Sequence, residues 1–491
     1  MVSRQVRIDI PVDVQAILGA LQSAGYPAYL VGGSVRDSLR IMLSDTDFME
    51  YPASGVGTSR TAPLLRRSPQ PSPRQHLDMS SIAQIEDWDI ASAAQPEQLA
   101  QVLSTYRVIA TGEAFGTMTV LTDQRPVQIT TFRADGTYSD NRHPDQVQFS
   151  RDITDDLARR DFTINAMAYS HESGLIDPFG GQFDLKSRTL RAVGQAEQRL
   201  AEDALRIMRA LRFAATLGFT IDDELREALH RQKGLLAQIS PERIQVELMK
   251  MLEADGQQLQ TVLLEYGDVL AVPIPEIAPM IGMDQLSPWH AYDVWEHSVR
   301  ALAASDTSDR YVRLALLLHD IGKPATFTID ANGRGHFYAH APAGADIAAK
   351  RLEALRFDRQ TIEITSELVR AHFAPTTAET ILKWLRRFGE QQLRRLIKVK
   401  QADMQAHIDT AVGQGMAQLQ KALDALDQAI AEEACFSLKQ LSIGGDDLIS
   451  IGFTSGPELG ATLEALLDAV IEGQLPNDRE ALLEAAKRGM P

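Results

Sequence analysis

The sequence contains very little cysteine. Cys435 is the single cysteine among 491 residues, which excludes an internal disulfide framework and any zinc or iron–sulfur site built from several cysteines. So little cysteine is typical of a reducing compartment. The chain also lacks an uninterrupted apolar run of about 18 residues, as a membrane-spanning helix requires, and its first residues lack the apolar core of a signal peptide. We therefore expect a cytoplasmic protein with no membrane span.

Basic residues are outnumbered by acidic ones. The chain has 49 Lys and Arg against 66 Asp and Glu, a net charge of −17, which favours solubility and argues against a protein coated with nucleic acid. An RNA substrate bound at a local basic surface remains compatible with this charge. The segment 383–400 carries seven basic side chains and one acid, Glu390. It is either such a surface or a solvated helix face.

The overall composition is that of a globular chain, but the local composition changes along the sequence. The 44% apolar and 23% charged content excludes a disordered, collagen-like or coiled-coil protein. The segment 41–85 differs from its surroundings, because residues 51–75 hold five prolines, four serines, four arginines and no acid. This composition predicts a flexible insertion. From about residue 155 onward nearly all of the pattern is helical, with a joint at 263–279 where prolines and glycine interrupt it.

The segment LVGGSVRD (30–37) predicts a strand, a Gly-Gly turn and the start of a helix. Paired glycines let backbone amides approach an anion closely, and a helix N-terminus adds positive potential. Arg36 could form a two-pronged contact with a phosphate. Gly-Gly turns are common, so this motif alone is a weak signal.

Asp87 and Asp89 lie two residues apart in EDWDIAS. In a strand, such residues point to the same face, and two carboxylates on one face suit Mg²⁺. Two such ions about 4 Å apart can activate an attacking hydroxyl and steady a leaving pyrophosphate. A lone Asp-x-Asp is usually an ordinary surface feature, so its meaning depends on the rest of the chain.

The two segments together with several later ones resemble class II tRNA nucleotidyltransferases, the CCA-adding enzymes, which share a superfamily with bacterial poly(A) polymerases. The turn GG-x-V-R-D and the segment DWDIAS-A-x-PE are followed, in the family's order, by TGEAFGTMTVL (111–121), TTFRADGTYSDNRHPDQVQF (130–149), DDLARRDFTINAMAY (155–169), EDALRIMRALRFAATLGF (202–219) and ISPERIQVEL (239–248). The resemblance covers roughly residues 7–40 and 86–410.

The resemblance implies an activity and its partners. Such an enzyme binds the acceptor end of tRNA and adds two C and one A to its 3′ end from CTP and ATP, without a nucleic-acid template, releasing pyrophosphate. Asp87 and Asp89 would hold two Mg²⁺, while Gly33 and Arg36 would steady phosphates. The alternatives with the same head motifs are an A-adding enzyme and a poly(A) polymerase. The loop within 130–149 has its full length, which disfavours CC-only addition, and the acidic C-terminus disfavours a poly(A) polymerase.

This chain departs from the family pattern in two places. The family's carboxylate pair usually follows the Gly-Gly turn closely, at the distance where this chain has Asp45 and Asp47. The sequence around Asp87 and Asp89 matches the family better, so we favour that pair and keep Asp45 and Asp47 as the alternative. The second departure is Gln128, at a strand position where the family often has Glu.

The segment EDALR predicts how one pocket could accept both C and A. On a helix, Asp203 and Arg206 would be neighbours, and Asp203 only accepts hydrogen bonds whereas Arg206 only donates them. Cytosine and adenine each present an amino donor beside a ring-nitrogen acceptor, which such a pair matches, whereas uracil and guanine would mismatch both contacts. The resemblance identifies the pair as the amino-acid template for CTP and ATP; an ordinary intrahelical ion pair is the alternative.

Four further residues are assigned by resemblance alone. Arg209 and Arg212 continue along the helix of Arg206 and would face the triphosphate or help to set the template. Arg160 and Asp161 in RRDFTINA would hold the ribose and phosphates of the incoming nucleotide.

A second group of residues lies in the helical part of the chain. His297, the adjacent His319 and Asp320, and Asp403 occur in the order of an HD domain. In active members of that family these four ligate a divalent metal that activates water for phosphate-ester hydrolysis. A phosphohydrolase is therefore a rival or secondary activity, and a scaffold that docks tRNA is the alternative role.

Three neighbouring residues bear on that metal site. His340 and His372 fall where auxiliary histidines often lie in HD domains. Ala341 follows His340 where Glu is expected, which counts against an intact site.

Together these observations predict an α+β fold. A small mixed α/β nucleotidyltransferase head spans 1–170, with the flexible segment 41–85 inserted in it. An all-α neck for nucleotide selection and RNA binding spans 171–262, an all-α HD domain spans 263–415, and a helical tail spans 416–491. The sequence does not indicate an oligomeric state.

Overall fold

The computed structural model describes residues 6–44, 87–112, 116–134, 148–287, 291–407 and 409–489. These residues pack as two compact units. The first comprises Met1–Ala210 and Gly218–Leu235, and the second comprises Leu211–Leu217 and Leu236–Pro491. Helix α7 (Leu205–Leu217) is therefore divided between the two. The four-part division predicted from the sequence is finer than this one and stays a prediction.

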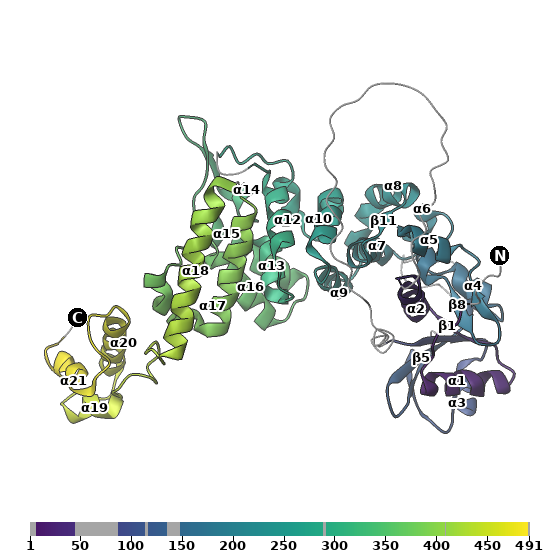
Figure 1. Cartoon of the computed structure of the whole chain (residues 1–491), viewed down its shortest axis with the longest axis horizontal. Helices are drawn as coiled ribbons and strands as arrows, with labels where there is room; N and C mark the ends of the chain where they lie inside the picture. The colour runs from purple at the N-terminus through teal and green to yellow at the C-terminus, as the bar shows by residue number, and fades with distance from the viewer. Residues whose placement is uncertain are drawn as a thin grey trace. The chain divides into compact units, whose positions relative to one another are not determined.

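The first unit is built on a mixed sheet of seven strands (Figure 1). Its central strand β2 (Asp89–Ser92) runs antiparallel to β1 (Ala28–Val31) and parallel to β5 (Pro126–Thr131). The full order is β3-β4-β5-β2-β1-β8-β9. The remaining strands are β3 (Arg107–Gly112), β4 (Thr117–Leu121), β8 (Ala168–Ser170) and β9 (Gly174–Ile176).

Helices cover this sheet because their apolar residues recur at helical spacing. In α1 (Val12–Ser23), Val14, Ile17, Leu18 and Leu21 are all buried, as the helical pattern of the N-terminal segment predicts. Figure 1 shows α1 beside α3 (Pro96–Val102), near β5. Helix α2 (Gly33–Ser44) begins at the Gly-Gly turn.

Two of the predicted loop segments lie mainly outside the described residues. Helix α2 continues to Ser44, so the segment 41–85 begins within its last turn. The rest of that segment, with the alternative ligands Asp45 and Asp47, lies outside the described residues. The same holds for residues 135–147, where the full-length loop is predicted.

The remainder of the first unit is mostly helical. Its core joins Val31 and Ala91 of the central strands to Leu157 of the helix that follows the sheet and to Val193. The elements are α4 (Ile153–Ala158), α5 (Gly181–Ser187), α6 (Ala196–Glu202), α8 (Asp223–Gln232) and the short strand pairs β6 (Arg133–Ala134) with β7 (Gln148–Phe149) and β10 (Thr189–Leu190) with β11 (Thr220–Ile221).

The second unit is almost entirely helical, and many of its helices begin after an aspartate. The carboxylates of Asp293, Asp309 and Asp358 accept backbone N–H groups of the first turns of α12, α13 and α16, which satisfies donors that a helix start leaves unpaired. The elements are α9 (Pro241–Met251), α10 (Gly256–Glu265), α11 (Gly267–Leu270), α12 (Val294–Ala304), α13 (Arg310–Leu318), α14 (Lys323–Thr326), β12 (Phe327–Ile329), β13 (Gly335–Phe337), α15 (His340–Ala354), α16 (Arg359–Ala371), α17 (Ile381–Gln405) and α18 (Asp409–Ala431).

The C-terminal helices α19 (Gly445–Ser450), α20 (Pro457–Ile471) and α21 (Arg479–Lys487) share a small core of their own. Helix α20 also faces the basic segment 383–400 of α17. Arg386 pairs with Glu464 and Asp468, and the ammonium of Lys383 lies 2.6 Å from Glu472. Lys383 and Arg386, at the start of that segment, are therefore paired with acids of the same chain.

The predicted α+β class is confirmed, with a mixed sheet near the N-terminus followed by helices. Among the described residues, no helix combines the length and the apolar character that a membrane crossing requires.

Candidate functional site

The Gly-Gly turn between β1 and α2 lies next to an arginine from a distant segment. Gly32 has φ +73°, which glycine adopts readily. A Cβ atom at Gly32 would lie 3.1 Å from Nη1 of Arg160. The missing side chain thus lets this guanidinium approach the turn. A cation beside a glycine turn at a helix start suits a phosphate group.

Asp89 is the first residue of β2, and Asp87 precedes the strand, with the buried Trp88 between them. Trp88 is 2% exposed, whereas Asp87 is exposed and Asp89 is half-buried. Burial raises the pKa of Asp89, the positive charge of Arg160 lowers it, and the negative charge of Asp87 raises it. Because the charges of Asp87 and Arg160 both act on Asp89, Arg160 lies near the carboxylate pair as well as near the Gly32 turn.

The second departure from the family pattern lies directly beside this pair. In the parallel register of β2 and β5, Gln128 is opposite Asp89, and its side chain is exposed. An amide oxygen can coordinate a hard cation but brings no negative charge. The site therefore has two carboxylates, Asp87 and Asp89, with an amide in the neighbouring strand position.

Arg36 is held by side chains near the turn. Its Nη2 lies 2.7 Å from Oδ2 of Asp37, and its Nη1 donates to Oδ1 of Asn165 at 2.8 Å. A Cβ atom on Gly33 would lie 3.7 Å from Nη2 of Arg36, so the guanidinium lies over the turn. A phosphate reaching Arg36 would have to compete with Asp37.

Arg160 shares a buried partner with its neighbour. Asp156 is fully buried and accepts hydrogen bonds from Arg159 at 2.5 Å and from Arg160 at 3.0 Å. Burial alone would raise the pKa of Asp156, but the two arginines lower it. Asp156 thus anchors Arg160 while other donors of that guanidinium face Gly32. Sequence reasoning missed Asp156, although its spacing to both arginines is that of helical neighbours.

Both carboxylate oxygens of Asp161 already accept hydrogen bonds from other residues of the chain. Its Oδ2 accepts from Nε of Arg209 at 2.8 Å, and its Oδ1 accepts from the backbone N–H of Phe162 at 2.8 Å and from Asn165 at 3.1 Å. Burial would raise the pKa of Asp161, but Arg209 and Asn165 lower it to about 2. The predicted contact of Asp161 with a ribose would require these bonds to rearrange.

The prediction that Asp203 and Arg206 share one helix is wrong. Helix α6 ends at Glu202 and α7 begins at Leu205, with Asp203 in the break between them (φ −141°, ψ 101°). The Asp203 carboxylate accepts the backbone N–H of Leu205 at 3.1 Å. Arg206 is buried and donates to Glu202 at 2.8 Å and to the carbonyl of Arg159 at 2.7 Å. Its ionic partner is therefore Glu202.

Arg212 lies in the part of α7 that belongs to the second unit. Its Nε is 2.6 Å from Glu247 of α9, and its guanidinium lies 4.0 Å from the centre of the Phe213 ring. The predicted contact with the triphosphate would have to compete with Glu247.

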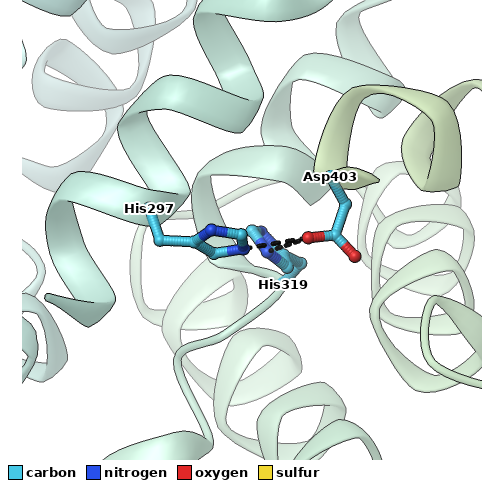
Figure 2. Close-up of side chains that lie close together, drawn as sticks. All are labelled: His297, His319 and Asp403. Carbon is cyan, nitrogen blue, oxygen red and sulfur yellow. Dashed lines mark hydrogen bonds and ion pairs between the residues drawn. The ribbon is translucent and has the colours of Figure 1, made fainter. Parts of the chain in front are cut away.

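The four predicted metal ligands of the second unit come together. His297 lies on α12, His319 and Asp320 follow α13, and Asp403 lies on α17. Figure 2 shows the imidazoles of His297 and His319 pointing toward Asp403. The Nε2 atoms of these histidines lie 2.9 and 3.5 Å from Oδ1 of Asp403.

The auxiliary histidines complete what we call the histidine cluster, which consists of His297, His319, Asp320, His340, His372 and Asp403. His340 begins α15 and His372 follows α16, and their Nε2 atoms are 3.3 Å apart. Two groups of three have ligand atoms within 4.8 Å of one another, a spacing that suits a metal ion, namely His297 with His319 and Asp403, and Asp320 with His340 and His372. Ala341 is buried in α15 and adds no ligand.

Charges are strongly coupled in the histidine cluster. Burial would lower the pKa of His319, but Asp320 and Asp403 raise it to about 10. Burial and the charge of His319 lower the pKa of His372 to about 3. The ammonium of Lys323, a residue that sequence reasoning missed although it lies three positions after Asp320, is 2.7 Å from Oδ2 of Asp320. The cluster thus pairs two carboxylates with nearby cations.

Models of known families match three parts of the chain. The poly A polymerase head domain matches residues 77–191, a probable RNA and SrmB-binding site of polymerase A matches 218–281, and a putative domain 2 of tRNA nucleotidyltransferases matches 342–486. The head model includes Asp87 and Asp89 and begins beyond Asp45 and Asp47. Residues 77–191 of the first unit therefore match a poly A polymerase head domain.

Relatives match along nearly the whole chain. The CCA-adding enzyme of Levilactobacillus brevis is 30% identical over 96% of both chains, and that of Leuconostoc mesenteroides is 32% identical over 97% of this chain and 96% of the other. The crystal structure of the Bacillus stearothermophilus CCA-adding enzyme in complex with CTP matches with a TM-score of 0.66 and 25% identity over 97% of both chains. The chain belongs to the CCA-adding enzyme family, as the sequence predicts.

Proposed function

We propose that this protein adds CCA to the 3′ end of tRNA, using CTP and ATP and releasing pyrophosphate. The observation that carries the proposal is the site at the start of β2, where the charges of Asp87 and Arg160 both act on Asp89 and Arg160 approaches the Gly32 turn. The full-length similarity to CCA-adding enzymes supports this choice over a poly(A) polymerase or an A-adding enzyme.

The carboxylate pair fits divalent cations. Asp89 is half-buried, and its pKa is raised both by that burial and by the like charge of Asp87. A cation between the two carboxylates would offset this repulsion. Mg²⁺ is the ion we propose, because it prefers carboxylate oxygens and substrate phosphates. When bound, it would lower the barrier to attack by the tRNA hydroxyl and neutralise the leaving pyrophosphate.

The remaining residues position the substrates. Arg160 would bind the nucleotide phosphates at the glycine turn, with Gly33 and Arg36 on the helix side of that turn. Glu202 and the Arg159 carbonyl hold the Arg206 guanidinium in place. From this position Arg206 would donate to the ring nitrogen of the incoming base. Asp203 would accept from the amino group of the base after its hydrogen bond to Leu205 rearranges. Arg209 would orient this helix through Asp161.

A primer-extension assay tests the proposal. Three tRNA transcripts, ending before CCA, after the first C and after CC, are each offered labelled CTP or ATP with Mg²⁺. Two C followed by one A on the shortest transcript is the expected result. ATP incorporation only on the CC-ended transcript would instead define an A-adding enzyme, and no incorporation on any transcript would refute the proposal.

A second activity is favoured by the histidine cluster. We propose that the helical part is an HD domain in which His297, His319, Asp320 and Asp403 hold a divalent metal for phosphate-ester hydrolysis. Their Nε2 and carboxylate atoms converge in a buried site, and imidazole suits transition metals. The test is hydrolysis of nucleotide phosphate esters with Mn²⁺ or Co²⁺, compared between the wild-type chain and His319→Ala. Equal rates for the two would reject it.

Two further assignments belong to this proposal. The division into head (1–170), neck (171–262), HD domain (263–415) and tail (416–491) is proposed on the motif order. A cytoplasmic location is proposed because a single cysteine is typical of a reducing compartment and tRNA and nucleoside triphosphates are the substrates.

A further inference from the structure

Asp156 is a buried carboxylate near the end of α4 that holds two neighbouring arginines. Its Oδ1 accepts from Nε and Nη2 of Arg159 at 3.1 and 2.5 Å, and its Oδ2 accepts from Nη2 of Arg160 at 3.0 Å. Burial raises the pKa of Asp156, but the charges of Arg160 and Arg159 outweigh it and lower the pKa. The carboxylate is therefore ionised at neutral pH, although none of it is exposed.

We propose that Asp156 is a positioning residue for nucleotide binding. It holds Arg160 at the glycine turn for the phosphates and, through Arg159, holds Arg206 for the base. This inference rests on the nucleotide addition proposed above and adds the group that keeps the phosphate and base contacts at one spacing.

The first link runs from Asp156 to the glycine turn. Asp156 takes Nη2 of Arg160, while Nη1 of the same guanidinium lies 3.1 Å from the place of a Cβ atom on Gly32. A planar guanidinium held at one corner presents its other donors in a fixed direction. Burial raises the pKa of Asp89, and the charge of Arg160 opposes that rise. The direction of Arg160 thus decides whether a phosphate near Asp89 meets a donor.

The second link runs through the backbone of Arg159. This residue follows the last turn of α4, and its carbonyl accepts from Nη2 of Arg206 at 2.7 Å. Asp156 holds the side chain of Arg159 by two hydrogen bonds, which restrains the residue that carries this carbonyl. Because Glu202 accepts from Nη1 of Arg206, the Arg206 guanidinium is held from two sides. Asp156 therefore supports one of the two contacts that place it.

Asp156 is itself fixed to the sheet. Its Oδ1 also lies 3.3 Å from the backbone nitrogen of Arg133, the first residue of β6, which donates to it. Apolar residues of α4 share a core with both central strands, namely Ile153 and Leu157 with Val31 and Ala91. Supporting groups hold a site residue most accurately when they lie on rigid elements. The helix of Asp156 is thus packed on the strand before the Gly-Gly turn and on β2, which begins at Asp89.

A purely neutralising role of Asp156 would have the opposite consequence. If the carboxylate only offset the charges of Arg159 and Arg160, its loss would leave more positive charge beside the phosphates and strengthen nucleotide binding. A positioning role predicts weaker binding, because Arg160 would lose the charge-assisted hydrogen bond that orients it. The direction of the change in KM therefore distinguishes the two roles.

The steady-state kinetics of Asp156→Asn test the positioning role. Asparagine keeps the size of the side chain but replaces one acceptor oxygen by a donor. We expect KM to rise at least about tenfold, both for CTP on the shortest transcript and for ATP on the CC-ended one, as when a hydrogen bond between charged groups is lost. The value of kcat should change by less than about threefold, because binding is weakened uniformly.

Asp155→Asn is the matched control. Asp155 is the exposed neighbour of Asp156 and accepts from the Ser150 hydroxyl at 2.5 Å, so this variant should keep the wild-type KM. Partial unfolding of either variant would lower the apparent kcat but not raise KM, because KM does not depend on the fraction of folded chains.

Arg160→Lys supplies a second test that does not require Asp156→Asn to fold. Lysine keeps the positive charge but lacks the planar fork that joins Asp156 to the turn, so KM for CTP and ATP should again rise about tenfold. The double variant Asp156→Asn/Arg160→Lys should stay within about twofold of the weaker-binding single variant, because both changes break the same link. Independent effects would multiply to about a hundredfold.

A phosphate probe and a base probe separate the two links. The inhibition constant of inorganic tripolyphosphate, which lacks a base, should rise in Asp156→Asn by about the same factor as KM for CTP. The preference for CTP over UTP should fall as well, because Arg206 loses the support of Arg159. An unchanged preference would overturn the link through Arg159, and an unchanged inhibition constant would overturn the link through Arg160.

A KM for Asp156→Asn or Arg160→Lys at or below the wild-type value would overturn the positioning role, and so would multiplied effects in the double variant. In each of these cases, nucleotide addition by the wild-type chain would leave the proposed function standing. A wild-type chain that incorporates neither CTP nor ATP would refute the proposed function and this inference together.

Discussion

The carboxylate pair of the first unit and the histidine cluster of the second unit differ in how far their charged side chains are buried. Asp87 is exposed and Asp89 half-buried at the start of a strand. In the histidine cluster, His297, His319 and Asp320 are each at most 1% exposed, and each faces another ligand. An open pair can receive a nucleotide and an RNA end together. A buried, prearranged cluster suits a metal ion and a small phosphate group.

The largest effect is expected from the open pair. Asp89→Asn should reduce incorporation of CTP and ATP by roughly a thousandfold, because metal-assisted charge stabilisation contributes several kcal/mol. Incorporation on the three tRNA transcripts measures it. Asp123→Asn is the matched control, since Asp123 is an exposed residue of the connection between β4 and β5; it should keep full activity.

The same assay decides between the two candidate pairs. Asp45→Asn and Asp47→Asn should leave incorporation within about twofold of wild type, as substitutions away from a reaction site usually do. A thousandfold loss in either of these, with Asp89→Asn active, would move the metal site to residues 45–47.

The buried cluster should be separable from the open pair. His319→Ala should lower phosphate-ester hydrolysis by at least about a hundredfold, because even loss of an outer-shell partner of a metal ligand typically costs 10–100-fold. CCA addition should stay unchanged, because His319 lies in the other unit. Parallel assays of both activities on one preparation measure this. Equal losses in both would show that the substitution unfolds the chain rather than removing a ligand.

The sequence predicted these two sites unequally well. The helices carrying His297 and Asp403 follow from local patterns. The strand was predicted to include both Asp87 and Asp89, but it begins at Asp89. The partners of the charged residues did not follow. At the break between α6 and α7, the Asp203 carboxylate accepts the backbone N–H of Leu205, and Arg206 pairs with Glu202. An aspartate side chain that bonds the nearby backbone in this way competes with helical hydrogen bonding. The segment around Asp203 holds several acidic and basic residues, so sequence spacing alone could not identify the ionic partner of Arg206.

Base selection should respond less strongly. Asp203→Ala should reduce the preference for CTP over UTP by about 10- to 100-fold, because the acceptor that distinguishes an amino group from a carbonyl is lost. Competition between labelled CTP and UTP on the shortest tRNA transcript measures the ratio. Glu224→Ala serves as the control, since Glu224 accepts from the Ala196 backbone N–H at the other end of α6. An unchanged ratio in Asp203→Ala would assign the selection to other residues.

The smallest expected effect is on stability and depends on pH. The folded pKa of Asp161 is lowered to about 2, against about 3.9 for an unfolded chain. A lowered pKa stabilises the fold above the unfolded value and loses that contribution as the pH falls from about 4 toward 2. This amounts to about 2–3 kcal/mol at neutral pH and roughly half of that at pH 3. Urea unfolding of Asp161→Asn and wild type should therefore differ most at pH 7 and converge on acidification. A difference that is constant from pH 7 to pH 3 would show that the ion pair with Arg209 is not its source.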